Sequence, residues 1–297
     1  MLVFACPGQG SQSEAFMKPW IERSQEFASQ VERLGESAGV DLLRLGTSAS
    51  EDEIKATENA QPLIVGATIA TYRAFFDGMA EGVVGHSVGE FAAAAIAGII
   101  SDSEAMRLVS IRGQAMAAAA AEVETSMAAV LGGDPDLVLD AISDAGLHAA
   151  NYNGAGQLVA AGKAEAISQL IANPPEKARV IQLKVAGAFH TPYMASAVDK
   201  LSAASSQVGI SDPRINIWTN HDGRLVESGD DFVAEMVQQT ARPVRWDLCM
   251  NALSDEGAHV VELPPAGALA GLLKRGAPGA VALALKSPDD IAKVEEI

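Results

Sequence analysis

The chain has 297 residues, of which 48% are hydrophobic and 20% are charged, and its formal net charge at pH 7 is −17. A chain of this length and composition folds around a large core, which excludes a disordered protein. The acidic excess argues against unspecific binding to nucleic acid or to an anionic membrane surface. No apolar run approaches the roughly 20 residues of a membrane helix, and the N-terminus lacks a secretory signal, so we expect a cytoplasmic protein.

Two cysteines, Cys6 and Cys249, are too few for a disulfide framework and suit a reducing compartment. Burial in the core is their expected role, and a catalytic cysteine is the alternative. The sequence contains neither a C-x-x-C nor an H-E-x-x-H pattern, and no complete dinucleotide fingerprint. We therefore expect no metal and no bound redox cofactor.

The chain begins with a short apolar strand, residues 1–5, which leads into a glycine-rich loop with the sequence PGQGSQ at 7–12. This loop completes neither of the common phosphate-binding patterns, so a nucleotide site is not expected. An amide or backbone donor such as that of Gln9 is instead available to a nearby reactive centre. Beyond the loop the pattern predicts an amphipathic helix over 20–45, a polar segment over 46–59 and a helix over 63–76.

Residues 85–90 have the sequence GHSVGE, with Ser87 between two glycines. An apolar strand over 82–85 precedes this motif and an alanine-rich helix from Glu90 follows it. This layout is typical of a nucleophile elbow, in which a serine on a sharp strand-to-helix turn needs small neighbours. Backbone N–H groups at the start of the helix point toward the reacting centre in such a turn. The alternative is a serine that caps the helix, with Glu90 completing a capping box.

A second helix is predicted from Ser101, where the sequence SDSE forms a capping box, to about Met116. Arg112 lies on this helix among apolar neighbours. Its guanidinium either pairs with a carboxylate in the core or is available to an anionic ligand, and the two interpretations are equally favoured.

From about residue 125 the pattern changes to an alternation of strands and helices, with strands near 127–131, 157–161 and 178–185. Helices are predicted over 135–145 and 163–171, and residues 151–156 are expected to form a turn-rich connection. This unit is compatible with a small ferredoxin-like α+β domain inserted into a larger one. We expect an α/β protein in which residues 1–123 and 189–297 form a large α/β-hydrolase-like domain with a parallel sheet, and residues 124–188 form the insert.

The chain re-enters the large domain at the loop 187–192, with the sequence GAFHTP, and continues through a helix over 193–206. His190 in this loop is the best candidate among the five histidines for a base that serves Ser87, because catalytic residues concentrate in such loops. Simple solvation of a loop histidine is the equally weighted alternative. His86 flanks the serine, so its side chain is expected to point away.

The order of these motifs closely resembles the malonyl-CoA:acyl carrier protein transacylases, most of all their actinobacterial branch. The resemblance covers essentially the whole chain. It rests on the spaced segments PGQGSQ (7–12), QP (61–62), GHSVGE (85–90), RG (112–113), 151–157, GAFH (187–190) and PVRW (243–246).

The resemblance implies a role for each matching position. Ser87 matches the nucleophile that carries the malonyl ester, and His190 matches its base. A backbone carbonyl in the region of Gln239 orients that base in place of an aspartate. Gln9 and the backbone N–H of Val88 match the oxyanion donors.

Three further positions match substrate-binding residues. Arg112 matches the residue that grips the free carboxylate of the malonyl group, since a planar guanidinium meets a carboxylate with two parallel hydrogen bonds. Phe189 and Asn153 match other substrate-binding positions. Val88 and Phe189 resemble the malonyl-selecting members of the family.

The implied activity is the transfer of malonyl from malonyl-CoA to the phosphopantetheine thiol of an acyl carrier protein, for fatty acid synthesis, by a ping-pong cycle. The implied partners are malonyl-CoA and the carrier protein, and we expect a monomer. A discrete acyltransferase of a polyketide synthase shares every motif and is the first alternative. A serine esterase shares the elbow but gives no reason for Arg112, and a carrier-binding scaffold without activity has no need of Ser87 and His190.

Overall fold

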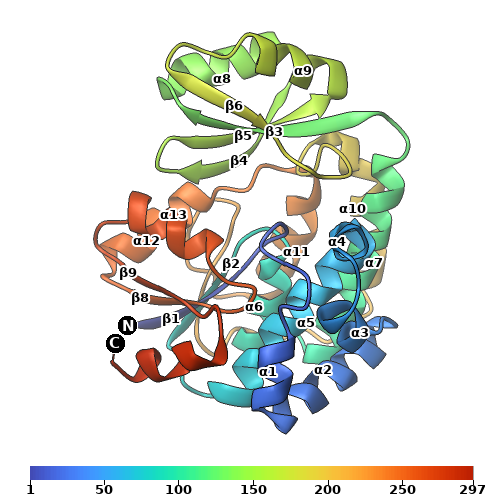
Figure 1. The fold of residues 1–297 in the computed structure, drawn as a ribbon, viewed down its shortest axis with the longest axis vertical. Helices are drawn as coiled ribbons and strands as arrows, with labels where there is room; N and C mark the ends of the chain where they lie inside the picture. Colours follow the sequence, from blue (N-terminus) through green and yellow to red (C-terminus); the bar gives the residue numbers. More distant parts are fainter. Residues whose placement is uncertain (297) are drawn as a thin grey trace.

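The computed structural model describes residues 1–296, apart from the side chain of residue 295. Two sheets organise these residues: a five-stranded parallel sheet in the order β7-β2-β1-β8-β9, and a four-stranded antiparallel sheet in the order β4-β5-β3-β6. Figure 1 shows the antiparallel sheet with α8 and α9 at one end of the molecule, above the helix-covered parallel sheet, and the two chain termini close together. The strands are β1 (Leu2–Cys6), β2 (Gly82–Gly85), β3 (Thr125–Gly132), β4 (His148–Gly154), β5 (Gln157–Lys163), β6 (Ala178–Gln182), β7 (Asn216–Trp218), β8 (His259–Glu262) and β9 (Val281–Ala284).

Helices surround both sheets. They are α1 (Lys18–Arg23), α2 (Gln25–Ala38), α3 (Leu42–Thr47), α4 (Glu51–Lys55), α5 (Thr57–Phe75), α6 (Gly89–Ala97), α7 (Asp102–Ala120), α8 (Pro135–Asp144), α9 (Ala164–Ala172), α10 (Ala195–Ser205), α11 (Gly229–Gln238), α12 (Trp246–Asp255) and α13 (Ala268–Gly276). Three short 3₁₀ segments complete the structure: η1 (Pro192–Met194), η2 (Gln239–Ala241) and η3 (Pro288–Glu296). The described residues contain no helix that is both long and apolar enough to cross a membrane.

The central strand β1 is covered by helices on both faces. Phe4 and Cys6 point to one face and belong to the larger core, which includes side chains of α2, α5, α6 and α7. Val3 and Ala5 point to the other face and pack with α12 and α13. Because successive strand residues face opposite sides, a parallel strand covered on both sides is apolar throughout, which explains the sequence LVFAC.

The carboxyl ends of three neighbouring strands bring polar loops to one edge of the parallel sheet. β1 leads into the loop that contains Gln9, β2 leads into Ser87, and β7 leads into Asn220. In open parallel sheets, ligands bind beyond the carboxyl ends of the strands. The fold therefore collects these three side chains where a site is expected.

The antiparallel sheet confirms the predicted fold class and corrects one element. Its elements follow the order β3-α8-β4-β5-α9-β6 with the strand order β4-β5-β3-β6, which is the ferredoxin-like arrangement. Residues 151–156 are not simply a connection, because residues 148–154 form β4 and pair with β5. The sequence analysis missed this strand because its sequence, HAANYNG, is polar and lacks a regular alternation. Its pairing with β5 also contains two register shifts.

The predicted helix over 20–45 is wrong as a single element. Ser24 has extended backbone and caps α2, while Gly39 ends α2 in the left-handed region, so three helices occupy this stretch. The polar segment 46–59 also contains α4, which Ser50 caps. Helix α5 begins at Thr57, six residues before the predicted start at residue 63, and it contains Pro62.

Other predicted elements agree with the structure. The helix α7 begins with the capping box at Ser101 and Glu104. Strands β3 and β5 and helices α8 and α9 lie within a few residues of their predicted bounds, and β6 ends at Gln182 instead of residue 185. Cys6 and Cys249 are both buried and unpaired, as expected for core residues.

Candidate active site

The turn between β2 and α6 holds Ser87 in an unusual backbone conformation. Its φ is +53°, in the left-handed region that side chains seldom occupy. A Cβ at Gly85 would lie 2.3 Å from the backbone N of Glu90, and a Cβ at Gly89 would lie 2.1 Å from the carbonyl oxygen of Cys6. The turn therefore requires both glycines, as the elbow motif predicts.

The Ser87 hydroxyl points to the imidazole of His190 and does not cap α6. Its Oγ lies 2.7 Å from His190 Nε2, and α6 has no side-chain cap at its N-terminus. The other ring nitrogen, Nδ1, lies 2.7 Å from the backbone oxygen of Gln239. A carbonyl oxygen only accepts, so Nδ1 carries the proton and Nε2 is left to accept the serine proton.

The environment of His190 favours the neutral imidazole. Burial, with a smaller contribution from the positive charge of Arg112, lowers its pKa to about 3, although the bond to the Gln239 carbonyl acts in the opposite direction. His190 also has a positive φ of 61°, so the loop holds it in a constrained conformation. A neutral imidazole is the form that takes a proton from a hydroxyl group.

Asn220 forms hydrogen bonds with the backbone of the elbow, and Glu90 forms a hydrogen bond with the backbone of Asn220. Asn220 Oδ1 accepts from the backbone N–H of Ser87 at 2.8 Å, and its Nδ2 donates to the Gly85 carbonyl at 2.7 Å. Glu90 Oε1 accepts from the backbone N–H of Asn220 at 2.6 Å. Both side chains are fully buried. Sequence reasoning missed these contacts, since Glu90 suggested only a cap and nothing near Asn220 marked it.

Arg112 is buried in α7 without a carboxylate partner among the described residues. Nη1 donates to Gln61 Oε1 at 2.6 Å and Nη2 to Gln239 Oε1 at 3.2 Å, while Nε has no partner within the described structure. Phe91 lies under the guanidinium, with its ring centroid 5.7 Å from Cζ. Burial lowers the pKa of Arg112 to about 10, so the group stays charged near neutral pH.

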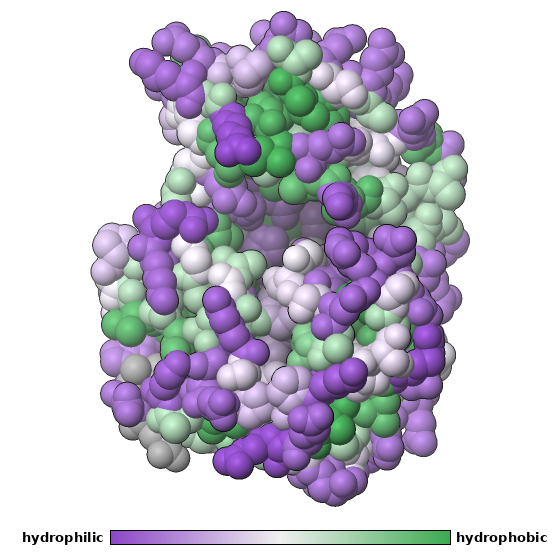
Figure 2. All heavy atoms as spheres, viewed as in Figure 1, coloured by the Kyte–Doolittle hydropathy of each residue, from purple (hydrophilic) through white to green (hydrophobic). Residues whose placement is uncertain are grey.

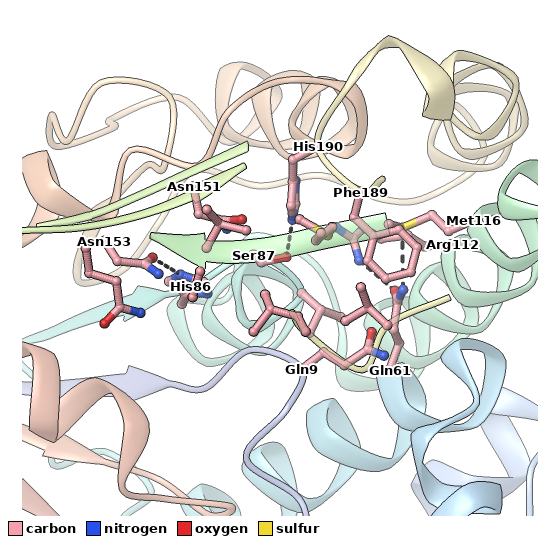
Figure 3. Close-up of a pocket in the computed structure, with 17 residues that line it drawn as sticks. Gln9, Gln61, His86, Ser87, Arg112, Met116, Asn151, Asn153, Phe189 and His190 are labelled. Atoms are coloured by element: carbon pink, nitrogen blue, oxygen red, sulfur yellow. Dashed lines mark hydrogen bonds between the residues drawn. The ribbon is translucent and has the colours of Figure 1, made fainter. Parts of the chain in front are cut away.

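A pocket of about 180 Å³ brings these groups together. It opens in the hollow between the two sheets, where Figure 2 shows a recess across the middle of the molecule. Its lining includes seven of the predicted site residues: Gln9, Ser87, Val88, Arg112, Asn153, Phe189 and His190. Figure 3 labels all of these except Val88 and shows them converging from both parts of the fold. Gln239, the eighth, is not among the lining residues but contacts both His190 and Arg112.

Two residues that line the pocket have backbone N–H groups available as donors. The N–H groups of Gln9 and Val88 donate to no protein acceptor within residues 1–296, and both residues line the pocket. The Gln9 side chain is turned aside, with Nε2 3.5 Å from the Lys55 carbonyl. The unpaired backbone groups, not the amide, are the available donors at this point.

His86 points away from Ser87, as expected, and joins the two sheets. Its Nε2 lies 3.1 Å from Asn153 Oδ1 on β4, and its ring meets Trp246 edge to face at 5.5 Å. Burial lowers the pKa of His86, so the neutral ring is favoured. Asn153 therefore lines the pocket, but its amide oxygen is already hydrogen-bonded to His86.

Comparisons with known proteins identify the family of the chain. The acyl transferase domain family matches residues 3–284. A malonyl CoA-acyl carrier protein transacylase from Mycobacterium bovis is 44% identical over the full length of both chains. The crystal structure of MCAT from Mycobacterium tuberculosis covers 99% of both chains with 44% identity and a TM-score of 0.93.

A further solved structure is a malonyl-transacylase in complex with the acyl carrier protein of a type II polyketide synthase. It is 26% identical, covers 99% of both chains and has a TM-score of 0.92. The full-length match at 44% identity, together with the matching domain family, defines the class of the protein. The chain belongs to the malonyl CoA-acyl carrier protein transacylase family and is an acyltransferase.

Proposed function

We propose that the protein moves a malonyl group from malonyl-CoA to the phosphopantetheine thiol of an acyl carrier protein, through an ester on Ser87. The observation that carries this proposal is the single pocket in which Ser87 Oγ lies 2.7 Å from a neutral imidazole and a buried guanidinium lacks a carboxylate. The first pair supplies a nucleophile, and the guanidinium selects an acyl group that carries its own carboxylate.

In the first half of the cycle, His190 Nε2 takes the Ser87 proton while Oγ attacks the thioester carbon of malonyl-CoA. The carbonyl oxygen becomes an oxyanion, and the backbone N–H groups of Gln9 and Val88 stabilise it. The C–S bond then breaks and His190 returns the proton to the leaving thiolate, which gives free coenzyme A and the malonyl ester.

In the second half, the carrier's phosphopantetheine thiol gives its proton to His190 and attacks the ester. Collapse of the intermediate releases Ser87 Oγ, which regains the proton. The Gln239 carbonyl keeps the imidazole in the required tautomer in both halves. The resemblance to known transacylases also assigns Phe189 and Asn153 to substrate binding, and Phe189 lies against the same pocket.

Arg112 gives the pocket its preference for malonyl over acetyl groups. Its Nε and remaining Nη protons are free to meet a carboxylate in a two-pronged arrangement. Such charge-assisted bonds contribute about 1.5 to 3 kcal/mol, or roughly one to two powers of ten in selection. A serine esterase has no use for this group, and its histidine is normally held by an acid.

The test is a transfer assay with malonyl-CoA and a phosphopantetheinylated carrier protein, with the carrier followed by mass spectrometry. We expect the wild-type protein to produce malonyl carrier and Ser87→Ala to produce none. Transfer by the S87A variant at the wild-type rate would overturn the proposal.

The likeness to a transacylase bound to a polyketide carrier supports a second candidate pathway for the same chemistry. A fatty-acid carrier and a polyketide carrier, tested at equal concentration, distinguish the two by kcat/KM. We propose fatty acid synthesis as the pathway, the cytoplasm as the compartment and a monomer as the working form. The limits of the inserted domain at residues 124 and 188 stay a prediction.

A further inference from the structure

A buried acid that the reaction scheme does not use contacts Gln239, which in turn contacts Arg112 of the pocket lining. Glu90 is in the first turn of α6, three residues after the nucleophile, and is 1% exposed. It forms no ion pair among the described residues. Burial raises the pKa of Glu90 to about 8, while the hydrogen bonds from Asn220 and Gln239 and the charge of Arg112 favour its ionised form. A buried acid with neither a counter-ion nor a place in the chemistry requires an explanation.

The contacts of Glu90 lead to the side chain of Gln239. Oε2 of Glu90 lies 2.6 Å from Gln239 Nε2, and Oε1 lies 2.6 Å from the backbone N of Asn220. The other end of the Gln239 amide, Oε1, accepts from Arg112 Nη2 at 3.2 Å. Gln239 thus lies between a group that only donates and a carboxylate that presents acceptors to it.

These neighbours determine which way the Gln239 amide faces. A guanidinium has no acceptor, so the amide oxygen must face Arg112. The amide nitrogen then faces Glu90, and it also approaches the Ser87 carbonyl oxygen and Asn220 Oδ1, each at 3.2 Å. The backbone carbonyl of the same residue holds His190 Nδ1. One glutamine therefore connects Glu90 to both the base and the anion-binding group.

We propose that Glu90 is a positioning residue that fixes the orientation of the Gln239 amide and, through it, aims the Arg112 guanidinium at the carboxylate of the acyl group. Gln61 anchors Nη1 and Gln239 anchors Nη2, so the two amide oxygens define the plane and rotation of the guanidinium. This inference rests on the proposed malonyl transfer and identifies the residue that prepares its selectivity.

The substitution Glu90→Gln tests this role because it preserves size and replaces one acceptor with a donor. The backbone N–H of Asn220 is fixed, so the remaining oxygen of the new side chain turns toward it. The new NH₂ group then opposes the Gln239 NH₂ group and displaces the Gln239 amide, which keeps only the Ser87 carbonyl and Asn220 Oδ1 as its acceptors. The Gln239 oxygen is then no longer held in place for Arg112 Nη2.

We expect E90Q to lower kcat/KM for malonyl-CoA about tenfold, by the loss of one charge-assisted hydrogen bond, and to lower that for acetyl-CoA much less. Gln239→Ala keeps the backbone carbonyl for His190 and should cause the same selective loss. In the double variant E90Q/Q239A the two losses should not multiply, since Glu90 acts through the amide that Q239A removes.

A second variant and a control separate positioning from general damage. Glu90→Met removes both acceptors without adding a donor, and it should lose the same preference for malonyl. Glu262→Gln makes the identical chemical change in another fully buried glutamate, which binds the start of α13, and should leave the malonyl-to-acetyl ratio unchanged. Thermal unfolding verifies that each variant is folded.

Equal losses for both acyl groups in E90Q and E90M, or losses that multiply in the double variant, would overturn the role of Glu90. A wild-type protein that forms no malonyl ester would instead overturn the proposed function, so the two failures are distinct.

Discussion

Two strand-to-helix turns lie on either side of β1 and differ in how the N–H groups at the start of the helix are satisfied. We call the turn from β8 to α13 the closed turn and the turn from β2 to α6 the open turn. The turn from β8 to α13 closes the start of its helix with Glu262, whose carboxylate accepts from the N–H groups of Gly267, Leu269 and Ala270 at 2.8 to 3.0 Å. The turn from β2 to α6 has no such cap, and the N–H of Val88 donates to no acceptor within the described residues.

The difference shows how a single fold separates stability from chemistry. At α13 the carboxylate satisfies donors that would otherwise be buried without a partner. At α6 the side chain of Glu90 accepts from Asn220 and Gln239 and not from the first N–H groups of the helix, so the N–H of Val88 stays unpaired among the described residues, next to Ser87. A turn that leaves a donor unpaired and a serine at positive φ loses local stability, which the surrounding fold must offset.

The largest expected effect comes from the base at the open turn. His190→Ala should lower kcat/KM for malonyl transfer by roughly 10² to 10⁴-fold, because Ser87 loses its proton acceptor. His148→Ala is a matched control, since His148 is an exposed histidine on the antiparallel sheet. If both variants kept wild-type kcat/KM in a steady-state transfer assay, the proposed general base would be wrong.

The next effect concerns the anion-binding group above the same turn. Arg112→Ala should lower kcat/KM for malonyl-CoA about ten- to a hundredfold more than for acetyl-CoA. Arg112→Lys retains a charge but not the planar arrangement of donors, so it should recover only part of the preference. Competition between the two thioesters, followed by mass spectrometry, measures the ratio directly. An unchanged ratio in R112A would make Arg112 a structural residue.

At the closed turn the expected effect is on stability alone. Glu262→Ala leaves the N–H groups of Gly267, Leu269 and Ala270, at the start of α13, without their acceptor. We expect the free energy of unfolding to fall by about 1 to 3 kcal/mol, as for the loss of a helix cap with charge-assisted bonds. Urea unfolding measures the loss, and the malonyl-to-acetyl ratio measured below the transition should stay at its wild-type value. A changed ratio would show that the closed turn also serves the pocket.

The smallest effect concerns the pH dependence of the reaction: kcat/KM should not fall at mildly acidic pH. Because burial lowers the pKa of His190 to about 3, its imidazole stays neutral well below the ordinary value of 6.5. The active form is the neutral one, so its fraction falls only as the pH approaches 3. We expect log kcat/KM for acylation, measured by rapid quench, to show no decrease from His190 between pH 7 and pH 5. A decrease of one unit per pH unit below about 6.5 would indicate a solvated imidazole.

The sequence allowed the fold class to be predicted because its signals are local. The apolar run of β1, the glycines beside Ser87 and the capping box at Ser101 are each signals carried by neighbouring residues. The strand β4 carried no such signal, because its asparagines are buried by contacts with distant segments, including the pairing of residue 151 with Val244.

The candidate site divides in the same way. Motifs marked Ser87, His190 and Arg112, and their roles stay predictions that the experiments above address. The arrangement of Glu90, Asn220 and the Gln239 side chain depends on hydrogen bonds between residues 130 to 149 positions apart. Neither hydrophobic periodicity nor a short motif predicts contacts between residues so far apart in the sequence, so they become visible only in the folded structure.

The central claim is that Ser87 carries the acyl group, and peptide mapping of the intermediate tests it most directly. The protein is mixed with malonyl-CoA without carrier protein, quenched in acid, digested and analysed by tandem mass spectrometry. We predict one malonyl group on the peptide that contains Ser87, which disappears when phosphopantetheinylated carrier is added before the quench. A malonyl group on another residue that the carrier discharges, or complete transfer without any ester at Ser87, would contradict the account.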